Sequence, residues 1–334
     1  MSQSPLNSEL RLKILAMIYK IRFVEEGIAE RYPKGEMRCP THLSIGQEGV
    51  PSVLSVLLTH QDLAVSTHRS HAHYLAKGGD MKAMLAEIYG REGGCSGGRG
   101  GSMHLIDESV GFKGSTAIVG NTIPIGVGLG LSIKLRQQND IAIVFVGDGA
   151  IEEGVFYEAA NFAAVQKLPV LFVCENNLYS VYAPLRDRQP EGRAIYRMVE
   201  GMGLQTSHGD GNNIDETYHL LSTAINAIKM GQGPQFVELE TYRWREHCGP
   251  FYDNDLGYRT ENEFLEWKER DPLTALEKQL LRAGEYLEAD LSALKKRVLE
   301  EVDQAFEYVQ GQPYAESSEA YSNVYCNPME CSHE

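Results

Sequence analysis

Two apolar segments of strand length, close together in the chain, constrain the fold most. Residues 141–146 (Ile-Ala-Ile-Val-Phe-Val) and 170–174 (Val-Leu-Phe-Val-Cys) are continuously apolar and rich in β-branched side chains, which is typical of strands buried in a parallel sheet. Between them, residues 152–166 carry apolar side chains at helical spacing. The order strand, glycine turn, helix, strand predicts a right-handed crossover unit. Because strands and helices continue to alternate up to residue 240, we expect an α/β fold with a doubly wound, mostly parallel sheet flanked by helices.

Polar residues follow each of these two strands. Asp148 stands between two glycines directly after the first strand, and Asn176 and Asn177 follow the second. Neighbouring parallel strands end at one edge of a sheet, where open α/β sheets bind ligands. Carboxylate and amide oxygens suit Mg²⁺ that holds a phosphate and suit zinc poorly. The alternative is that Asp148 caps the next helix and the asparagines form a turn. The pairing of the two motifs favours the metal site, and it resembles the Mg²⁺ and diphosphate signature of thiamine-diphosphate enzymes.

The length and patterning of the chain indicate one large domain. Of its 334 residues, 43% are hydrophobic, which is enough to bury a full core. We expect a single domain over residues 1–310, with a helix at residues 9–31 at its start and charged amphipathic helices over residues 261–310 at its end. Residues 311–334 are expected to form a tail.

Charge and cysteine usage narrow the classes of partner. The formal net charge of −15 argues against a nucleic acid or an anionic membrane, because either needs a basic face to neutralise phosphates. No apolar run reaches transmembrane length and residues 1–7 do not resemble a targeting segment, so a cytoplasmic location is expected. The six cysteines are scattered without a CxxC pair, so neither zinc ligation nor a disulfide framework is expected, and Cys174 is expected in the core.

Two segments ahead of the central unit carry further polar chemistry. Residues 67–73 contain His68 and Arg69; an arginine can grip a diphosphate with two parallel hydrogen bonds, and a histidine can donate beside it. The alternative there is a solvated loop. Residues 90–104 include seven glycines, which favours a loop that passes close to a cofactor over a flexible linker. The helix expected at residues 124–135 also has glycines, but their GxGxG spacing and the lack of an expected strand before them argue against a dinucleotide motif.

A long polar and aromatic loop follows the last expected strand. That strand spans residues 235–240, and the loop over residues 241–259 is too long for a tight connection, so we expect it to be functional. Cys248 follows His247 in this loop. A thiol activated by the histidine is one interpretation, and an ordinary unactivated thiol is the other.

Six short motifs occur in order between residues 42 and 177. They are His42 with Gly46-Gln-Glu48, His68-Arg69 with His71, Gly100-Gly-Ser-Met-His104, Ile118-Val-Gly120, Gly147-Asp-Gly149 and Glu175-Asn-Asn177. Together they resemble the α chain of the decarboxylating component of 2-oxo acid dehydrogenase complexes, the pyruvate, acetoin and branched-chain group. The resemblance extends over about residues 10–275.

The resemblance implies a role for each matching residue. It implies that Asp148 and Asn177 ligate Mg²⁺ through their side chains, and Tyr179 through its backbone carbonyl. The residues implied to bind thiamine diphosphate are His68 (at a position that is often tyrosine), Arg69, Ala117, Val119, Gly149 and Arg243, with Asp148 and Asn177 through the metal. His42 and His247 are implied to face the reacting carbon and the substrate, and His247 is the preferred candidate for proton transfer.

The resemblance also implies the reaction and the partners. The chain would take part in decarboxylation of a pyruvate-like 2-oxo acid, with the thiazolium ring accepting the electrons that CO₂ leaves behind, and the acyl group would pass to a lipoyl-bearing acyltransferase. Thiamine enzymes need a second domain with a glutamate that activates the aminopyrimidine. This sequence contains material for the diphosphate domain alone, so a separate β chain in an α₂β₂ assembly is implied, and we expect the isolated chain to be inactive.

The loop over residues 245–257 departs from the family pattern. Cys248 stands where many members have serine, and the segment before Tyr258 is longer, so regulation by phosphorylation there, the usual substrate and the usual acceptor are all in doubt. Glu246, Asp253 and Asp255 are expected to add negative charge at the mouth of the site. A thiamine-dependent carboligase or acetoin-cleaving enzyme is therefore the alternative. A non-enzymatic paralogue is disfavoured, because the implied cofactor ligands are present.

Overall fold

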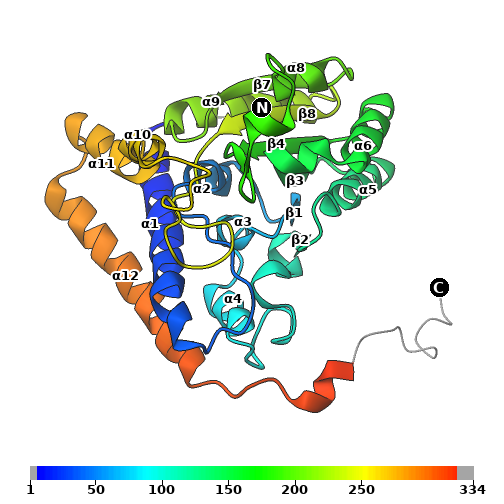
Figure 1. Cartoon of the computed structure of the whole chain (residues 1–334). Helices are drawn as coiled ribbons and strands as arrows, with labels where there is room; N and C mark the ends of the chain where they lie inside the picture. Colours follow the sequence, from blue (N-terminus) through cyan, green and yellow to red (C-terminus); the bar gives the residue numbers. More distant parts are fainter. Residues whose placement is uncertain (1–5, 322–334) are drawn as a thin grey trace.

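The computed structural model describes residues 6–321, and a six-stranded sheet lies at its centre (Figure 1). The strand order is β2-β1-β3-β4-β8-β7, and every neighbouring pair is parallel. The strands are β1 (Leu63–Ser66), β2 (Phe112–Ser115), β3 (Ala142–Gly147), β4 (Val170–Asn176), β7 (Gln205–Asp210) and β8 (Gln235–Glu240), and a short antiparallel pair, β5 (Tyr179–Ser180) and β6 (Ala183–Pro184), lies apart from them. Because the chain builds outwards to both sides of β1, the sheet is doubly wound, and the predicted fold class is confirmed.

Most of the helices lie where the apolar periodicity predicts them. They are α1 (Ser8–Arg31), α2 (Gly49–Leu57), α3 (His71–Ala76), α4 (Met81–Ile88), α5 (Thr122–Leu135), α6 (Gly154–Val165), α7 (Leu185–Arg188), α8 (Ile195–Glu200), α9 (Ile214–Lys229), α10 (Glu261–Glu269), α11 (Pro272–Arg282) and α12 (Glu288–Gln310). The side chain of Asn7 caps α1 by accepting a hydrogen bond from the Leu10 backbone N–H at 2.9 Å. Among the described residues, no helix combines the length and the apolar character needed to cross a bilayer.

The predicted crossover unit is confirmed. Strands β3 and β4 pair without a shift from Ala142 opposite Val170 to Gly147 opposite Glu175, and α6 connects them. The helix starts two residues later than predicted, because the turn after β3 first forms a 3₁₀ segment, Asp148–Glu152. Asp148 and Asn177 therefore leave neighbouring strands at the same edge of the sheet.

The two faces of the sheet bury alternate side chains in two separate cores. In β3, Ile143 and Phe145 belong to a core shared with α1, α2 and α9, whereas Val144 and Val146 belong to a second core with α5 and α6. Figure 1 shows α1 and α2 on one side of the sheet and α5 and α6 on the other. Because both faces are covered, β3 and β4 are continuously apolar over residues 142–146 and 170–174, which is the pattern the sequence shows.

Several elements were missed by the sequence analysis: the short elements β5, β6 and α7, and also β2 and α3. The expectation that no strand precedes the helix at residues 124–135 is wrong, because β2 lies at the edge of the sheet next to β1. Its sequence, Phe-Lys-Gly-Ser, has a single apolar side chain and no alternation, so periodicity could not reveal it. Residues 71–76 form α3 rather than a loop, because two of its polar residues, His71 and His73, are buried at 0% and 3% exposure instead of facing water.

The glycines of α5 serve close packing of a helix on the sheet. A Cβ atom on Gly126 would lie 2.3 Å from Cγ2 of Val144 in β3, and one on Gly130 would lie 2.4 Å from Cγ2 of Val170 in β4. Both distances are far below van der Waals contact, so any side chain there would push α5 off the sheet. This explains these two glycines without a dinucleotide.

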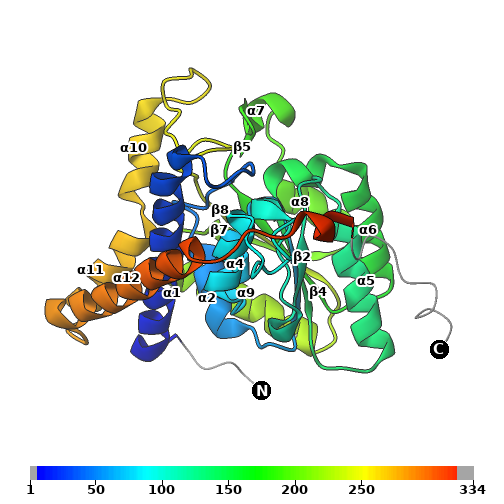
Figure 2. The same ribbon diagram turned by 90° about the horizontal axis from the view of Figure 1, so that it is seen from below.

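The C-terminal helices wrap around the N-terminal one. Helix α12 packs along α1, and the chain beyond it crosses α4 towards α5 (Figure 2). The backbone N–H of Glu92 donates to the carbonyl of Pro313 at 3.1 Å, and the Arg91 guanidinium lies 3.9 Å from the centre of the Tyr314 ring. Residues 311–321 of the expected tail are thus packed against the start of the glycine-rich segment, and residues 322–334 lie outside the described residues.

Candidate active site

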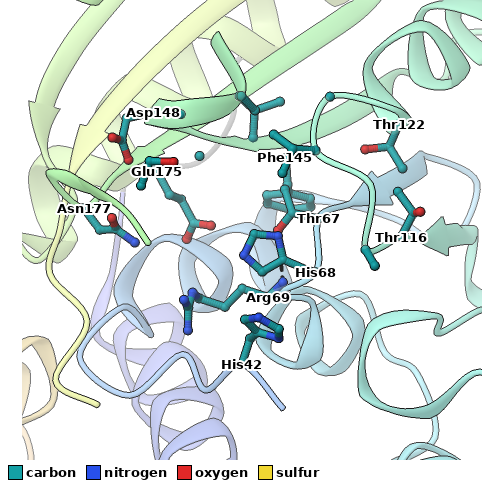
Figure 3. Close-up of a pocket in the computed structure, with 18 of the residues that line it drawn as sticks. His42, Thr67, His68, Arg69, Thr116, Thr122, Phe145, Asp148, Glu175 and Asn177 are labelled. Atoms are coloured by element: carbon teal, nitrogen blue, oxygen red, sulfur yellow. Dashed lines mark hydrogen bonds between the residues drawn. The ribbon is translucent and has the colours of Figure 1, made fainter. Parts of the chain in front are cut away.

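A pocket lies at the carboxyl edge of the sheet, beyond the ends of β1, β3 and β4 (Figure 3). It encloses about 970 Å³, including its open mouth. Ten of the residues predicted for the site line it: His42, His68, Arg69, Ala117, Val119, Asp148, Gly149, Asn177, Tyr179 and His247. They come from six separate stretches of the sequence, and the fold brings them together at the edge where parallel sheets bind ligands.

Asp148 supplies a buried carboxylate to the pocket. It is 1% exposed, and this burial raises its pKa, although the neighbouring Arg188 guanidinium acts in the opposite direction. Arg188, at the end of α7, forms ion pairs with both Asp148 and Glu152. Sequence analysis missed Arg188, because an arginine in a polar loop gives no sign of the partner it will reach.

Asn177 is fixed in orientation by two hydrogen bonds. Its side-chain oxygen accepts from the backbone N–H of Tyr179 at 3.2 Å, and its side-chain nitrogen donates to Oε1 of Gln47 at 3.1 Å. The turn that follows contains Leu178 and Val181 at positive φ, +70° and +55°, a conformation that costs energy for a side chain and is rare for a β-branched one. The backbone after β4 is therefore held in a tight, strained turn beside Asp148.

Arg69 places a positive charge in the pocket, and Glu25 and Glu175 act on its pKa without forming an ion pair with it among the described residues. Its guanidinium donates to the backbone carbonyls of Leu43 at 2.5 Å and His247 at 3.2 Å. Burial lowers its pKa to about 10, so the group stays protonated at neutral pH. Within residues 6–321, no acidic side chain approaches Arg69 to ion-pair distance. The charge is thus available to attract an anion into the pocket.

Three histidine rings, those of His42, His68 and His247, meet beside Arg69. The ring centre of His42 lies 4.6 Å from that of His68 and 4.9 Å from that of His247. The ring centres of His68 and His247 are 5.3 Å apart. Burial, reinforced by the charge of Arg69, lowers the pKa of His68 to about 4 and that of His247 to about 3, and the pKa of His42 is lowered further. All three rings are therefore neutral at pH 7, the form that can accept a proton.

Arg243 is the predicted site residue that the structure does not bring to the pocket. It belongs to the loop over residues 241–259 and is fully buried. Its guanidinium donates to the carbonyl of Val181 at 2.9 Å and to the Tyr258 hydroxyl at 2.7 Å. Asp253 pairs with it at 3.3 Å and also forms an ion pair with Arg259. The expectation that Asp253 adds charge at the mouth is therefore wrong, because this carboxylate is 1% exposed and lies between two guanidinium groups.

A chain of buried hydrogen bonds ends at Glu175 in the pocket. His73 lies between its partners, with Nε2 at 2.7 Å from the Glu175 carboxylate and Nδ1 at 2.7 Å from the Ser66 hydroxyl. The His73 ring also stacks on Phe145 at 3.8 Å between centres. Sequence analysis did not single out this arrangement, since only the fold brings α3 next to the ends of β1, β3 and β4.

The two expectations for individual cysteines are resolved differently. Cys174 is fully buried in β4, as predicted. Cys248 is exposed, and partial desolvation raises the pKa of its thiol, which favours the protonated, unreactive form over an activated thiolate.

Comparisons with known proteins identify the family. The family model described as "Dehydrogenase E1 component" matches residues 16–318. The pyruvate dehydrogenase E1 component subunit alpha of Rickettsia felis is 37% identical over 92% of this chain and 93% of its own length. The chloroplastic subunit alpha-3 of Arabidopsis thaliana is 35% identical over 92% of this chain and 72% of its own, and the subunit alpha of Zymomonas mobilis is 34% identical over 94% and 88%. The chain therefore belongs to the dehydrogenase E1 component family.

Proposed function

We propose that this chain is the α subunit of a thiamine-diphosphate-dependent 2-oxo acid dehydrogenase that decarboxylates a pyruvate-like substrate. The family and the α-subunit names of its relatives support an oxidoreductase of this class. The observation that carries the proposal is a single pocket in which a buried carboxylate and amide lie beside an unpaired arginine and three neutral histidines.

The residues at the ends of β3 and β4 fit a Mg²⁺ ion. Asp148 offers a carboxylate and Asn177 an amide oxygen from neighbouring strands, and Tyr179 adds a backbone carbonyl in the strained turn; these are the hard oxygen donors that Mg²⁺ prefers. Arg188 pairs with Asp148 in this structure, so metal binding requires Arg188 to release that carboxylate.

The same pocket fits a diphosphate. Arg69 supplies a buried positive charge that no carboxylate approaches to ion-pair distance among the described residues, and His68 lies beside it. A Cβ atom on Gly149 would lie 2.6 Å from the Ser180 hydroxyl, so glycine there lets Ser180 pack against the turn that follows β3. The loop with Ala117 and Val119 lines another wall, where its backbone groups would face the aminopyrimidine.

The chain's own residues would position the reactants and move protons. Thiamine diphosphate, when bound, supplies a thiazolium ring that takes up the electrons released with CO₂. His247 and His42 are neutral at pH 7, so each ring can hydrogen-bond the substrate oxygen. To transfer a proton, their pKa values would have to rise towards neutral pH, and the negative charge of a bound diphosphate would shift them in that direction. Arg243 would act indirectly in this structure, by holding the loop that carries His247.

A β subunit is proposed to complete the site. The loop over residues 117–120 exposes apolar side chains beside the pocket, with Ile118 at 65% and Val119 at 49% exposure, and α5 and α6 expose Ile125, Leu135, Phe162 and Val165. Large apolar side chains exposed on neighbouring elements are typical of a protein interface. We propose an α₂β₂ assembly in which the β chain supplies the activating glutamate, a lipoyl-bearing acyltransferase as acceptor, and a cytoplasmic location.

The proposal is tested by reconstitution. The chain is co-expressed with a β-type chain encoded beside it, and the purified complex is assayed with a panel of 2-oxo acids, Mg²⁺ and thiamine diphosphate, first with a redox dye and then with an aldehyde acceptor. We expect dye reduction that collapses in the Asp148→Ala variant. CO₂ release that requires the aldehyde would instead assign the carboligase alternative, which the relatives' names do not favour. Failure to bind the cofactor would overturn the enzymatic assignment.

A further inference from the structure

Three imidazole rings from distant parts of the sequence meet in the pocket. His42 comes from the loop before α2, His68 from the end of β1 and His247 from the loop after β8. One ring nitrogen from each lies within 4.8 Å of the other two, and within residues 6–321 this is the one group of three metal-ligating side chains at such spacing.

The rings have unused bonding capacity. His42 is 6% exposed, and its Nδ1 atom is buried without a hydrogen-bond partner in the described part of the chain. A buried ring nitrogen without a partner loses its bond to water and gains nothing in return. Because burial keeps the pKa values of all three rings low, each has a free lone pair at neutral pH, which is the form that ligates metals.

We propose that His42, His68 and His247 form a binding site for a borderline divalent transition-metal ion, such as Zn²⁺ or Co²⁺, with one coordination position left open. Three neutral imidazoles are the donor set of open zinc sites, whereas Mg²⁺ prefers oxygen. The proposed site is therefore chemically distinct from the Asp148 and Asn177 donors on the opposite wall (Figure 3).

The geometry requires a modest closure of the rings. Tetrahedral ligands at the usual zinc–nitrogen bond length lie about 3.4 Å apart. The nitrogens, at up to 4.8 Å, must therefore approach by as much as about 1.4 Å. His68 and His247 are on loops and are partly exposed, so ring rotation can supply this movement. The charge of Arg69 opposes a second cation, so the affinity is expected to be weaker than that of a dedicated structural zinc site.

Metal binding would have a consequence for catalysis. An ion held by His42 and His247 occupies the ring nitrogens that the proposed decarboxylation uses for proton transfer, so it would inhibit the enzyme. This consequence rests on the proposed function, whereas metal binding itself does not. A direct binding measurement therefore separates a failure of the metal site from a failure of the proposed activity.

The test is a titration of the full-length chain with Co²⁺ alone, after removal of any purification tag. Bound Co²⁺ with nitrogen ligands gives a visible absorption band, which we expect to saturate at one ion per chain. His68→Gln and His247→Gln should each weaken binding by roughly tenfold or more. His219→Gln removes an exposed histidine from α9 and should leave the titration unchanged. Circular dichroism verifies that each variant is folded.

X-ray absorption at the cobalt edge of the wild-type chain gives an answer that does not depend on the variants. Three imidazole ligands per ion are expected. Fewer than three, the lack of a saturable visible band, or equal Co²⁺ affinity in the wild type and both pocket variants would each overturn the proposal.

Discussion

At the scale of single residues, the neutral histidines make stability depend on pH. The ordinary histidine pKa is 6.5, and in the folded chain that of His68 is lowered to about 4 and that of His247 to about 3. Between pH 6.5 and the lowered pKa values, these histidines are protonated in the unfolded chain but not in the folded chain. The contribution to stability is therefore complete above pH 6.5 and is lost as the pH falls towards 4, by at most about 1.4 kcal/mol per pKa unit.

His68→Gln tests this dependence. Urea unfolding is measured at about pH 7.5 and about pH 5. The variant should lose less stability between the two than the wild type, because glutamine does not titrate. Arg69 acts on the pKa of both rings and Arg243 also acts on that of His247, and neither arginine is changed in the variant. An equal loss in both proteins would mean that the ring is protonated in the folded chain.

Asp253 is the residue on which the loop over the pocket depends most. It is the carboxylate between the buried Arg243 and Arg259. Asp253→Asn leaves two buried guanidinium groups without a counter-charge, so we expect the free energy of unfolding to fall by about 3–5 kcal/mol. Asp255→Asn, two positions along at an exposed site, is the matched control and should change it by less than about 0.5 kcal/mol. A loss for Asp253→Asn no larger than for the control would show that the pair does not stabilise the loop.

The site residues show what a sequence can predict at this scale. Motif spacing could indicate that His42, Arg69, Asp148 and Asn177 serve one pocket, because each follows or precedes a recognisable strand or helix. The pairing of Arg243 with Asp253 could not be predicted, since it depends on how a nineteen-residue loop over residues 241–259 folds back on itself. The roles assigned to the individual residues stay predictions.

At the scale of elements, α7 places Arg188 against Asp148, the proposed metal ligand. Arg188 at its end competes with a cation for the Asp148 carboxylate. Arg188→Gln removes that competitor, so we expect the Mg²⁺ concentration needed for half-maximal thiamine diphosphate binding to fall about tenfold, the value of one charge-assisted hydrogen bond. Calorimetric titration at several Mg²⁺ concentrations measures it. Arg186→Gln, with a side chain 71% exposed in the same helix, is the control. A higher Mg²⁺ requirement in Arg188→Gln would mean that Arg188 assists cofactor binding.

Apolar pattern explains which elements could be predicted. The central strands β3 and β4 have long apolar runs because both faces of the sheet are covered, and the predicted β8 bounds, residues 235–240, match the structure although β8 mixes apolar and polar residues. Elements whose buried polar side chains form hydrogen bonds inside the protein have no apolar pattern by which they could be predicted. In α3, His71 bonds to Ser102 at 2.7 Å and His73 to Glu175, so its buried face is polar.

At the scale of the whole molecule, the resemblance to the family and the predicted fold class are confirmed, and they have a common physical basis. The pocket is assembled from residues 42–69, 117–123, 145–150, 175–181 and 247, so no short segment could reveal it. The order of the motifs could reveal the pocket, because a doubly wound sheet brings the ends of successive strands to one edge.

The molecule as a whole is expected to be inactive by itself. One side of the pocket is bounded by exposed apolar residues, Ile118 and Val119, which the other residues within 6–321 leave uncovered. The isolated chain should therefore bind thiamine diphosphate weakly and release no CO₂, and addition of the β-type chain should restore both while the mass of the assembly, measured by light scattering, rises to that of two α and two β chains. Val119→Asp places a charge on this apolar surface and should prevent assembly without unfolding the chain, whereas Leu287→Asp, at an exposed apolar position before α12, should not. Decarboxylation by the isolated chain would require the activating carboxylate to come from its own pocket, where Glu175, held by His73, is the one acid other than Asp148 that lines it.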